Sequence, residues 1–229
     1  MGQPFWSQFV TTFIEKGRYL MFLEGLGRTL IIALCAVVIG VALGIVAAVI
    51  KVYNHRTGGL KPLRALVDIY LQIFRGTPVV VQLLIWYYII LVNVKSGLLV
   101  AIIGFGINSG AYVAEIFRAG IMSVDLGQSE AGRSLGLSEM QSMRYIILPQ
   151  AIKNTLPALF NEFISLLKET SVAGYITVID LTKAGDLVRS RTMLAFFPLL
   201  SVALVYFILV AVLTQLQANL ERRLRKGER

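Results

Sequence analysis

The feature of this sequence that most constrains its fold is a series of long apolar runs without any charged residue. Residues 29–50, 76–94, 96–114 and 192–220 contain no Asp, Glu, Lys or Arg. A helix needs about 20 apolar residues to cross the hydrocarbon core of a bilayer. A fifth run, residues 154–179, is apolar except for Glu162, Lys168 and Glu169. We therefore predict an all-α integral membrane protein with five transmembrane helices, over about residues 29–50, 66–92, 97–119, 154–179 and 193–219.

The distribution of positive charge predicts the orientation of these spans. The formal net charge is +9, but the basic residues lie between apolar runs and not on a soluble basic domain, which argues against a nucleic-acid partner. If the N-terminus is outside, residues 51–64, 118–153 and the basic tail 221–229 are cytoplasmic. These segments hold more than half of the 22 Lys and Arg residues, as the positive-inside rule requires. We predict an external N-terminus and a cytoplasmic C-terminus.

Residues 1–25 precede the first span and do not read as a signal peptide, because a basic start and a small-residue cleavage site are both missing. Aromatic residues recur at helical spacing over residues 4–18, which predicts a helix lying in the outer membrane interface. A poorly ordered terminus is the alternative. Cys35 is the single cysteine and is expected to be a small buried residue in mid-span, so neither a disulfide nor a metal site is predicted.

Glycine and proline mark special points within the spans. Gly40 and Gly44 in the first span, and Gly106 and Gly110 in the third, form small-residue faces that another helix can approach closely. We expect two copies of such a subunit to assemble through these faces. In the second span the sequence Arg75-Gly76-Thr77-Pro78 predicts a break, because proline lacks an N–H and glycine loosens a helix.

The longest predicted cytoplasmic segment, residues 123–150, has the signals of a small helical element. Helix formers occupy residues 126–135, Gly136 stands where a C-terminal cap would be, and Ser138 with Gln141 forms a capping box that opens a second helix. Acidic and basic residues alternate in it, which is not the charge pattern of a DNA-binding helix-turn-helix. Outside, residues 180–191 form a mixed-charge stretch that is either a partner-binding loop or a solvated connector.

The segment from Glu130 to Pro149 resembles the EAA signature of the transmembrane subunits of bacterial ABC importers. The matching residues are Glu130-Ala131-Gly132, Gly136 and Ile146-Ile147-Leu148-Pro149, with Gly132 where the family usually has a second alanine. Further segments look like the polar amino-acid permeases of the histidine, glutamine and arginine type. These segments are Phe74-Arg75-Gly76-Thr77-Pro78, Ala111 to Arg118, Asn161-Glu162-Phe163 and Leu167 to Ser171.

This resemblance implies a multi-pass subunit of a bacterial inner membrane, with residues 26–220 as one permease domain. It implies a second transmembrane subunit, identical or related, two cytoplasmic ATPase subunits and an external amino-acid-binding protein. The sequence has no P-loop, so ATP and Mg would be bound by the ATPase subunits, and this chain is expected to be neither an enzyme nor a cofactor-binding protein. The residues expected to couple it to the ATPase are Glu130, Ala131, Gly132, Gly136, Leu137 and Ser138.

Polar residues within the spans are the candidates for the substrate pathway, because an ionisable group in a bilayer is costly unless it is paired or lines water. An amino acid needs acceptors for its ammonium group, which Glu162 or Glu115 would supply. It needs donors for its carboxylate, which Asn108, Thr77 or Arg75 would supply. Tyr112 lies one turn from Asn108, and Glu162 shares a helix face with Glu169. The alternative is that these groups pair with one another between helices.

Two other functions compete with the importer. An ion-coupled carrier or channel subunit would also be apolar, but carriers commonly show broken helices in both halves, and this sequence shows one obvious break. A membrane enzyme would need a catalytic constellation, and His55 and Cys35 do not supply one. Whether the substrate is a cationic or a neutral polar amino acid, and whether this subunit or the binding protein selects it, stays open at this point.

Overall fold

The computed structural model describes residues 4–226, except for the side chains of residues 55–57, 225 and 226. Arg56 and Arg225, both predicted to face the cytoplasm, thus have side chains outside the described part. All regular elements in the described residues are helical, as predicted. They are α1 (Phe5–Phe9), η1 (Val10–Ile14), η2 (Glu15–Gly17), α2 (Tyr19–Thr57), α3 (Lys61–Gly76), α4 (Val79–Ile85), η3 (Trp86–Ile90), α5 (Gly97–Met122), α6 (Leu126–Ser134), α7 (Glu139–Ser142), η4 (Met143–Ile147), α8 (Leu148–Glu169), η5 (Thr170–Ile176), α9 (Leu181–Thr192) and α10 (Phe196–Lys226).

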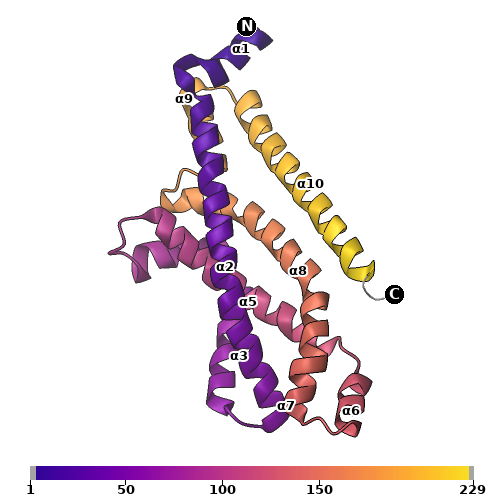
Figure 1. The fold of residues 1–229 in the computed structure, drawn as a ribbon. Coiled ribbons are helices and arrows are strands. Elements are labelled where there is room, and N and C mark those ends of the chain that lie inside the picture. Colours follow the sequence, from indigo (N-terminus) through magenta and orange to yellow (C-terminus); the bar gives the residue numbers. More distant parts are fainter. Residues whose placement is uncertain (1–3, 227–229) are drawn as a thin grey trace.

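Helix α2 is the long axis of the molecule (Figure 1). It has 39 residues and is therefore about 58 Å long, well beyond the hydrocarbon core of about 30 Å. It begins ten residues before the predicted first span and includes the first half of the predicted basic loop, residues 51–57. Lys51 explains part of this extension, because its ammonium nitrogen lies 2.8 Å from the Asp68 carboxylate of α3, which also contacts Arg64. Helices α6 and α7 lie at the opposite end of the molecule from α1 and α9.

The predicted break in the second span is present and sharp. Helix α3 ends at Gly76, and the chain turns by 112° before it continues as α4 and η3. Within the described residues, α2, α5 and α10 are each long and apolar enough to cross a membrane, and the bent pair is a fourth candidate. Helix α8 is not among these candidates; it carries four charged residues, Lys153, Glu162, Lys168 and Glu169, together with uncharged polar residues such as Gln150, Asn154 and Asn161.

The second half of the chain departs from the predicted bounds in three places. Helix α8 begins at Leu148, six residues before the predicted fourth span, and Pro149 lies in its first turn. Residues 181–192 form helix α9, whereas a loop was expected. Asp180 caps this helix by accepting hydrogen bonds from the N–H groups of Thr182 and Lys183. Helix α10 continues through most of the predicted basic tail.

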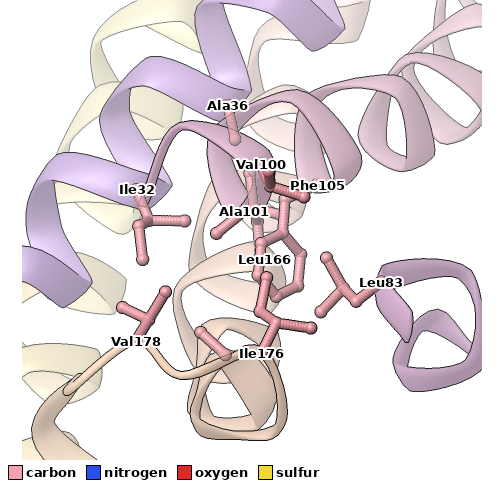
Figure 2. Packing of buried hydrophobic residues seen from close by; sticks show 10 residues of the cluster. Ile32, Ala36, Leu83, Val100, Ala101, Phe105, Leu166, Ile176 and Val178 are labelled. Carbon is pink, nitrogen blue, oxygen red and sulfur yellow. The ribbon is translucent and has the colours of Figure 1, made fainter. Parts of the chain in front are cut away.

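The main apolar core forms where α2, α4, α5, α8 and η5 meet. Figure 2 shows Phe105 of α5 between Leu83 of α4 and Leu166 of α8, with Ile32 and Ile176 beside them. All five side chains are fully buried. The bent second span is thus fixed to the centre of the molecule and not left at its edge.

The small-residue faces pack against each other within one chain. A Cβ atom at Gly44 would lie 2.4 Å from the Val113 side chain, and one at Gly40 would lie 2.9 Å from Ser109 Oγ. On the opposing helix, Gly106 faces Ile39. The expectation that these faces mediate assembly of two subunits is therefore wrong, because α2 and α5 already occupy them.

The N-terminal residues, predicted as one helix over residues 4–18, form the three short helices α1, η1 and η2, and their aromatic side chains contact the start of α10. The ring centroids of Phe5 and Phe9 lie 4.8 and 5.8 Å from that of Phe197. Trp6 remains exposed, as a residue in a membrane interface would be. Cys35, expected to be buried, is exposed on α2, since this face of the helix has no neighbour in the described part of the chain.

Candidate functional site

The candidate site is built around Glu162, which projects from α8 toward α5. Ser109 is fully buried on α5, and its hydroxyl donates a hydrogen bond of 2.9 Å to the Glu162 carboxylate. The two helices approach closely because Gly120 has no side chain: a Cβ there would lie 2.1 Å from the Thr155 methyl group. Because α8 begins early, Glu162 is about 21 Å along it and not the 12 Å or so that a start at Asn154 would give.

A positive charge reaches the same region from the bent second span. Arg75 lies in the last turn of α3, and its guanidinium carbon is 5.8 Å from the centre of the Tyr112 ring. Tyr112 is on α5, one turn after Ser109, and remains partly exposed. The structure therefore places Arg75 and Glu162 against the same turn of α5, Arg75 over Tyr112 and Glu162 at Ser109. Their part in a substrate pathway stays a prediction.

Glu169 is a site residue that the sequence interpretation did not include in the pathway. It lies seven residues, about two turns, after Glu162 on the same face of α8. Among the described residues it forms no ion pair. The seven-residue spacing was the available signal for a second carboxylate on this face.

Asn108 and Thr77 have a different role from the predicted one. Asn108 is 2% exposed, and its amide group donates to the Phe74 carbonyl oxygen at 3.2 Å and to Gln82 Oε1 at 2.8 Å. The Thr77 hydroxyl donates to the Ile73 carbonyl oxygen and accepts from Gln82 Nε2. Both residues therefore hold the break in the second span, and their hydrogen-bonding groups are occupied. Asn108, Thr77 and Arg75 were the three predicted donors for a carboxylate. Of these, Arg75 is the one that donates no hydrogen bond to another residue in the described structure.

The Glu115 carboxylate also has a partner within the chain. It forms an ion pair with Arg118, one turn later on α5, with two contacts between the guanidinium and the carboxylate. The alternative interpretation of the charged residues was that they pair between helices; Glu115 instead pairs within its own helix, with Arg118 three residues later. The pair lines a cavity of about 840 Å³ between the ends of α2, α3 and α5 and the α6–α7 element.

The α6–α7 element has the capped geometry that the sequence predicts. Helix α6 ends in a Schellman motif, in which the Gly136 N–H donates to Arg133 and the Leu137 N–H donates to Gly132. Gly136 has φ +86°, a conformation that L side chains rarely adopt. Ser138 and Gln141 form the expected reciprocal capping box. These caps give the element a defined geometry that a flexible loop would lack.

The exposed surface of this element is available to a partner protein. Glu130, Ala131 and Ser138 are exposed, and the large apolar side chains of Leu126 and Leu135 are 80% and 84% exposed. Gly132 was expected to permit docking of a partner, but it is buried against its own chain. A Cβ there would lie 2.7 Å from Ser142 Oγ and 2.8 Å from Ile146, so glycine is needed for the α6–α7 contact itself.

Comparison with known proteins identifies relatives over most of the chain. The family described as "Binding-protein-dependent transport system inner membrane component" matches residues 40–226. A putative glutamine transport system permease protein of Rickettsia bellii is 40% identical over 210 residues, covering 90% of this chain and 94% of the relative. The arginine transport system permease protein of Bacillus subtilis is 37% identical over 209 residues, covering 90% of this chain and 93% of the relative.

Two solved structures share the fold. A crystal structure of an amino acid ABC transporter with histidines superposes with a TM-score of 0.86 and 40% identity, covering 97% of this chain and 100% of that chain. The MetNI methionine ABC transporter in an inward-facing form superposes with a TM-score of 0.78 at 21% identity, covering 92% of this chain and 99% of that chain. The match of the family over residues 40–226 and the identity of 40% to relatives of nearly the same length establish that this chain belongs to the binding-protein-dependent transport system inner membrane components.

Proposed function

We propose that this chain forms the pathway by which polar amino acids, cationic ones included, cross a bacterial inner membrane. The observation that supports this most is the group formed by Glu162, Arg75 and Tyr112. A carboxylate, which can bind the ammonium group of an amino acid, and a guanidinium, which can bind its carboxylate, both contact the same turn of α5: Glu162 accepts a hydrogen bond from Ser109, and Arg75 lies over the Tyr112 ring. Relatives named as glutamine and arginine permeases support the substrate class.

Membership of the family makes the chain a permease subunit of an ABC importer, with the ATPase activity in separate subunits. We propose that two ATPase subunits bind the α6–α7 elements of two such permease subunits and hold ATP and Mg. An external amino-acid-binding protein would deliver the substrate at the α1 and α9 end. The carrier or channel alternative is disfavoured, because neither would need a rigid capped element of this kind.

We propose five membrane crossings, with α8 and η5 as the fourth. Helix α8 carries charges because it lines the pathway, and that is why it is less apolar than α2, α5 or α10. The opposite positions of α6–α7 and α9 support this topology (Figure 1). In a Cys35→Ser background, a cysteine replacing Lys183 should react with an impermeant thiol reagent added outside intact cells. Reaction only from the cytoplasmic side would contradict the five-span topology.

The proposed function is tested by reconstituting the permease with its ATPase subunits in vesicles, with the binding protein and a radiolabelled amino acid outside and ATP inside. We expect accumulation of arginine, lysine, histidine or glutamine that requires both ATP and the ATPase subunits. Uptake by the permease alone, driven by an ion gradient, would support a carrier and refute the proposal. ATP-dependent uptake of none of these amino acids would refute the substrate class.

A further inference from the structure

The break in the second span is held together by the side chain of Gln82. This residue lies in the first turn of α4 and is 6% exposed. Its Nε2 atom lies 3.0 Å from the Phe74 carbonyl oxygen, 3.0 Å from the Thr77 carbonyl oxygen and 2.9 Å from Thr77 Oγ1. One amide group thus connects the helix after the break with the end of the helix before it.

The sequence explains why the Phe74 carbonyl needs this donor. In a continuous helix it would accept from the N–H of the residue four positions later, which is Pro78 and has no N–H. An unsatisfied carbonyl is costly where no water is available. The amide groups of Gln82 and Asn108 both donate to it and replace the missing bond.

The same network reaches the helix that carries Tyr112. Gln82 Oε1 accepts from the Asn108 amide at 2.8 Å, so both the donor and the acceptor side of the Gln82 amide are used. Asn108 lies one turn before Tyr112 on α5. Arg75 directly follows Phe74, whose carbonyl is the shared acceptor. The network therefore fixes the backbone beside Arg75 relative to the turn of α5 that bears the aromatic ring under its guanidinium.

We propose that Gln82 is a positioning residue for substrate recognition, which holds Arg75 over Tyr112 so that the guanidinium can bind the carboxylate of the amino acid. This inference rests on the pathway proposed above. A guanidinium recognises a carboxylate through a planar fork, and its contribution depends on orientation. Loosening the network should thus weaken recognition of the carboxylate more than recognition of the rest of the substrate.

The first experiment compares substrates with and without a carboxylate. Binding to the complex of permease and ATPase subunits in lipid nanodiscs is measured for arginine and for agmatine, which lacks the carboxylate, and for glutamine and its decarboxylated amine. In Gln82→Leu we expect the preference for the amino acid over its amine to fall about tenfold, or about 1.4 kcal/mol, with the affinity for the amine unchanged. Gln72→Leu, the same change at an exposed site on α3, should keep the wild-type preference.

A double-variant comparison separates positioning from a general loss of structure. If Gln82 acts through Arg75, adding Gln82→Leu to Arg75→Ala should lower the preference no further than Arg75→Ala alone. An unchanged preference in Gln82→Leu would overturn the proposal, and so would an equal loss of affinity for the amino acid and its amine. Should Gln82→Leu not insert, Asn108→Ala removes two bonds of the network, those to the Phe74 carbonyl oxygen and to Gln82 Oε1, and leaves the bonds that Gln82 donates. It should shift the preference in the same direction by a smaller factor.

A second experiment needs no transport substrate, so that failure of the proposed function can be recognised separately. In a Cys35→Ser background, cysteines replace Arg75 and Tyr112, and a short bifunctional thiol reagent joins them. We expect Gln82→Leu to slow this cross-link severalfold, whereas Gln72→Leu leaves it unchanged. An unaltered rate in Gln82→Leu would overturn the positioning role, even if amino-acid uptake by the wild type is confirmed. Absence of amino-acid binding by the wild type would instead refute the proposed function.

Discussion

The contact between α2 and α5 can be tested with a single added methyl group. At Gly44 the new Cβ of Gly44→Ala would lie 2.4 Å from a Val113 methyl group and 2.8 Å from the backbone nitrogen of Ala114. The side chain of Val113 can rotate, but the Ala114 nitrogen belongs to a helix and cannot. The two helices must therefore separate by roughly half an ångström or more to restore a van der Waals contact.

Overpacking of this kind typically costs about 1–3 kcal/mol, while replacing glycine by alanine within a helix returns up to about 1 kcal/mol. We expect a net loss of about 1–2 kcal/mol. For a chain of this size the unfolding midpoint should fall by roughly 2–8 °C. Separation of the helices should also displace Ser109, which hydrogen-bonds Glu162, so substrate affinity should fall as well.

The assay is thermal unfolding of the detergent-solubilised subunit, followed by tryptophan fluorescence. Gly27→Ala is the matched control, because a Cβ at this position of α2 would have nothing within 4 Å. It should leave the midpoint unchanged or raise it slightly. Equal midpoints for Gly44→Ala and Gly27→Ala would show that α2 and α5 do not pack through their glycines, and the arrangement of the site would then need revision.

Two further predictions concern the coupling element and the second carboxylate. Gly136→Leu forces a branched side chain into φ +86°, where there is open space but the backbone is strained. The variant should insert normally and lose most substrate-stimulated ATP hydrolysis. Gln128→Leu at an exposed site of α6 is the control, and normal stimulation in Gly136→Leu would contradict the coupling role. If Glu169 binds the side chain of a cationic substrate, Glu169→Gln should lower uptake of arginine about tenfold relative to glutamine, because a charge-assisted hydrogen bond is lost. Glu24→Gln, the same change at an exposed site on α2, is the control, and an unchanged ratio of the two uptake rates in Glu169→Gln would exclude Glu169 from recognition.

Local signals predicted the parts of the fold that depend on neighbouring residues. The capping box at Ser138, the left-handed Gly136 and the break before Pro78 are determined within a few residues, and the structure has all three. Helix α9 was also locally encoded. Asp180 is a typical N-cap, and apolar residues recur behind it at helical spacing, but the mixed charges suggested a loop. The charged side chains of α9 lie on its exposed face and are compatible with a helix.

Parts of the site that depend on tertiary contacts could not be predicted in this way. Asn108 has the properties of a ligand-binding amide, and only the position of the broken second span shows that the Phe74 carbonyl and Gln82 occupy it. The role of Gln82 could not be predicted from the sequence, because one glutamine in an apolar run does not show which groups it hydrogen-bonds or toward which helix its side chain points. The glycine pairs indicated close packing, but the sequence does not specify whether the approaching helix belongs to the same subunit.

The central claim, that Glu162 faces the substrate, is tested most directly by the uptake of Glu162→Gln in reconstituted vesicles. This change keeps the shape of the side chain and removes its charge. Glu24→Gln makes the same change at an exposed site on α2. With wild-type ATPase subunits and binding protein, we predict that Glu162→Gln lowers arginine uptake about tenfold or more, and glutamine uptake less, while expression and basal ATP hydrolysis match those of Glu24→Gln. Wild-type uptake of every polar amino acid by Glu162→Gln would show that this carboxylate is structural and would contradict the account.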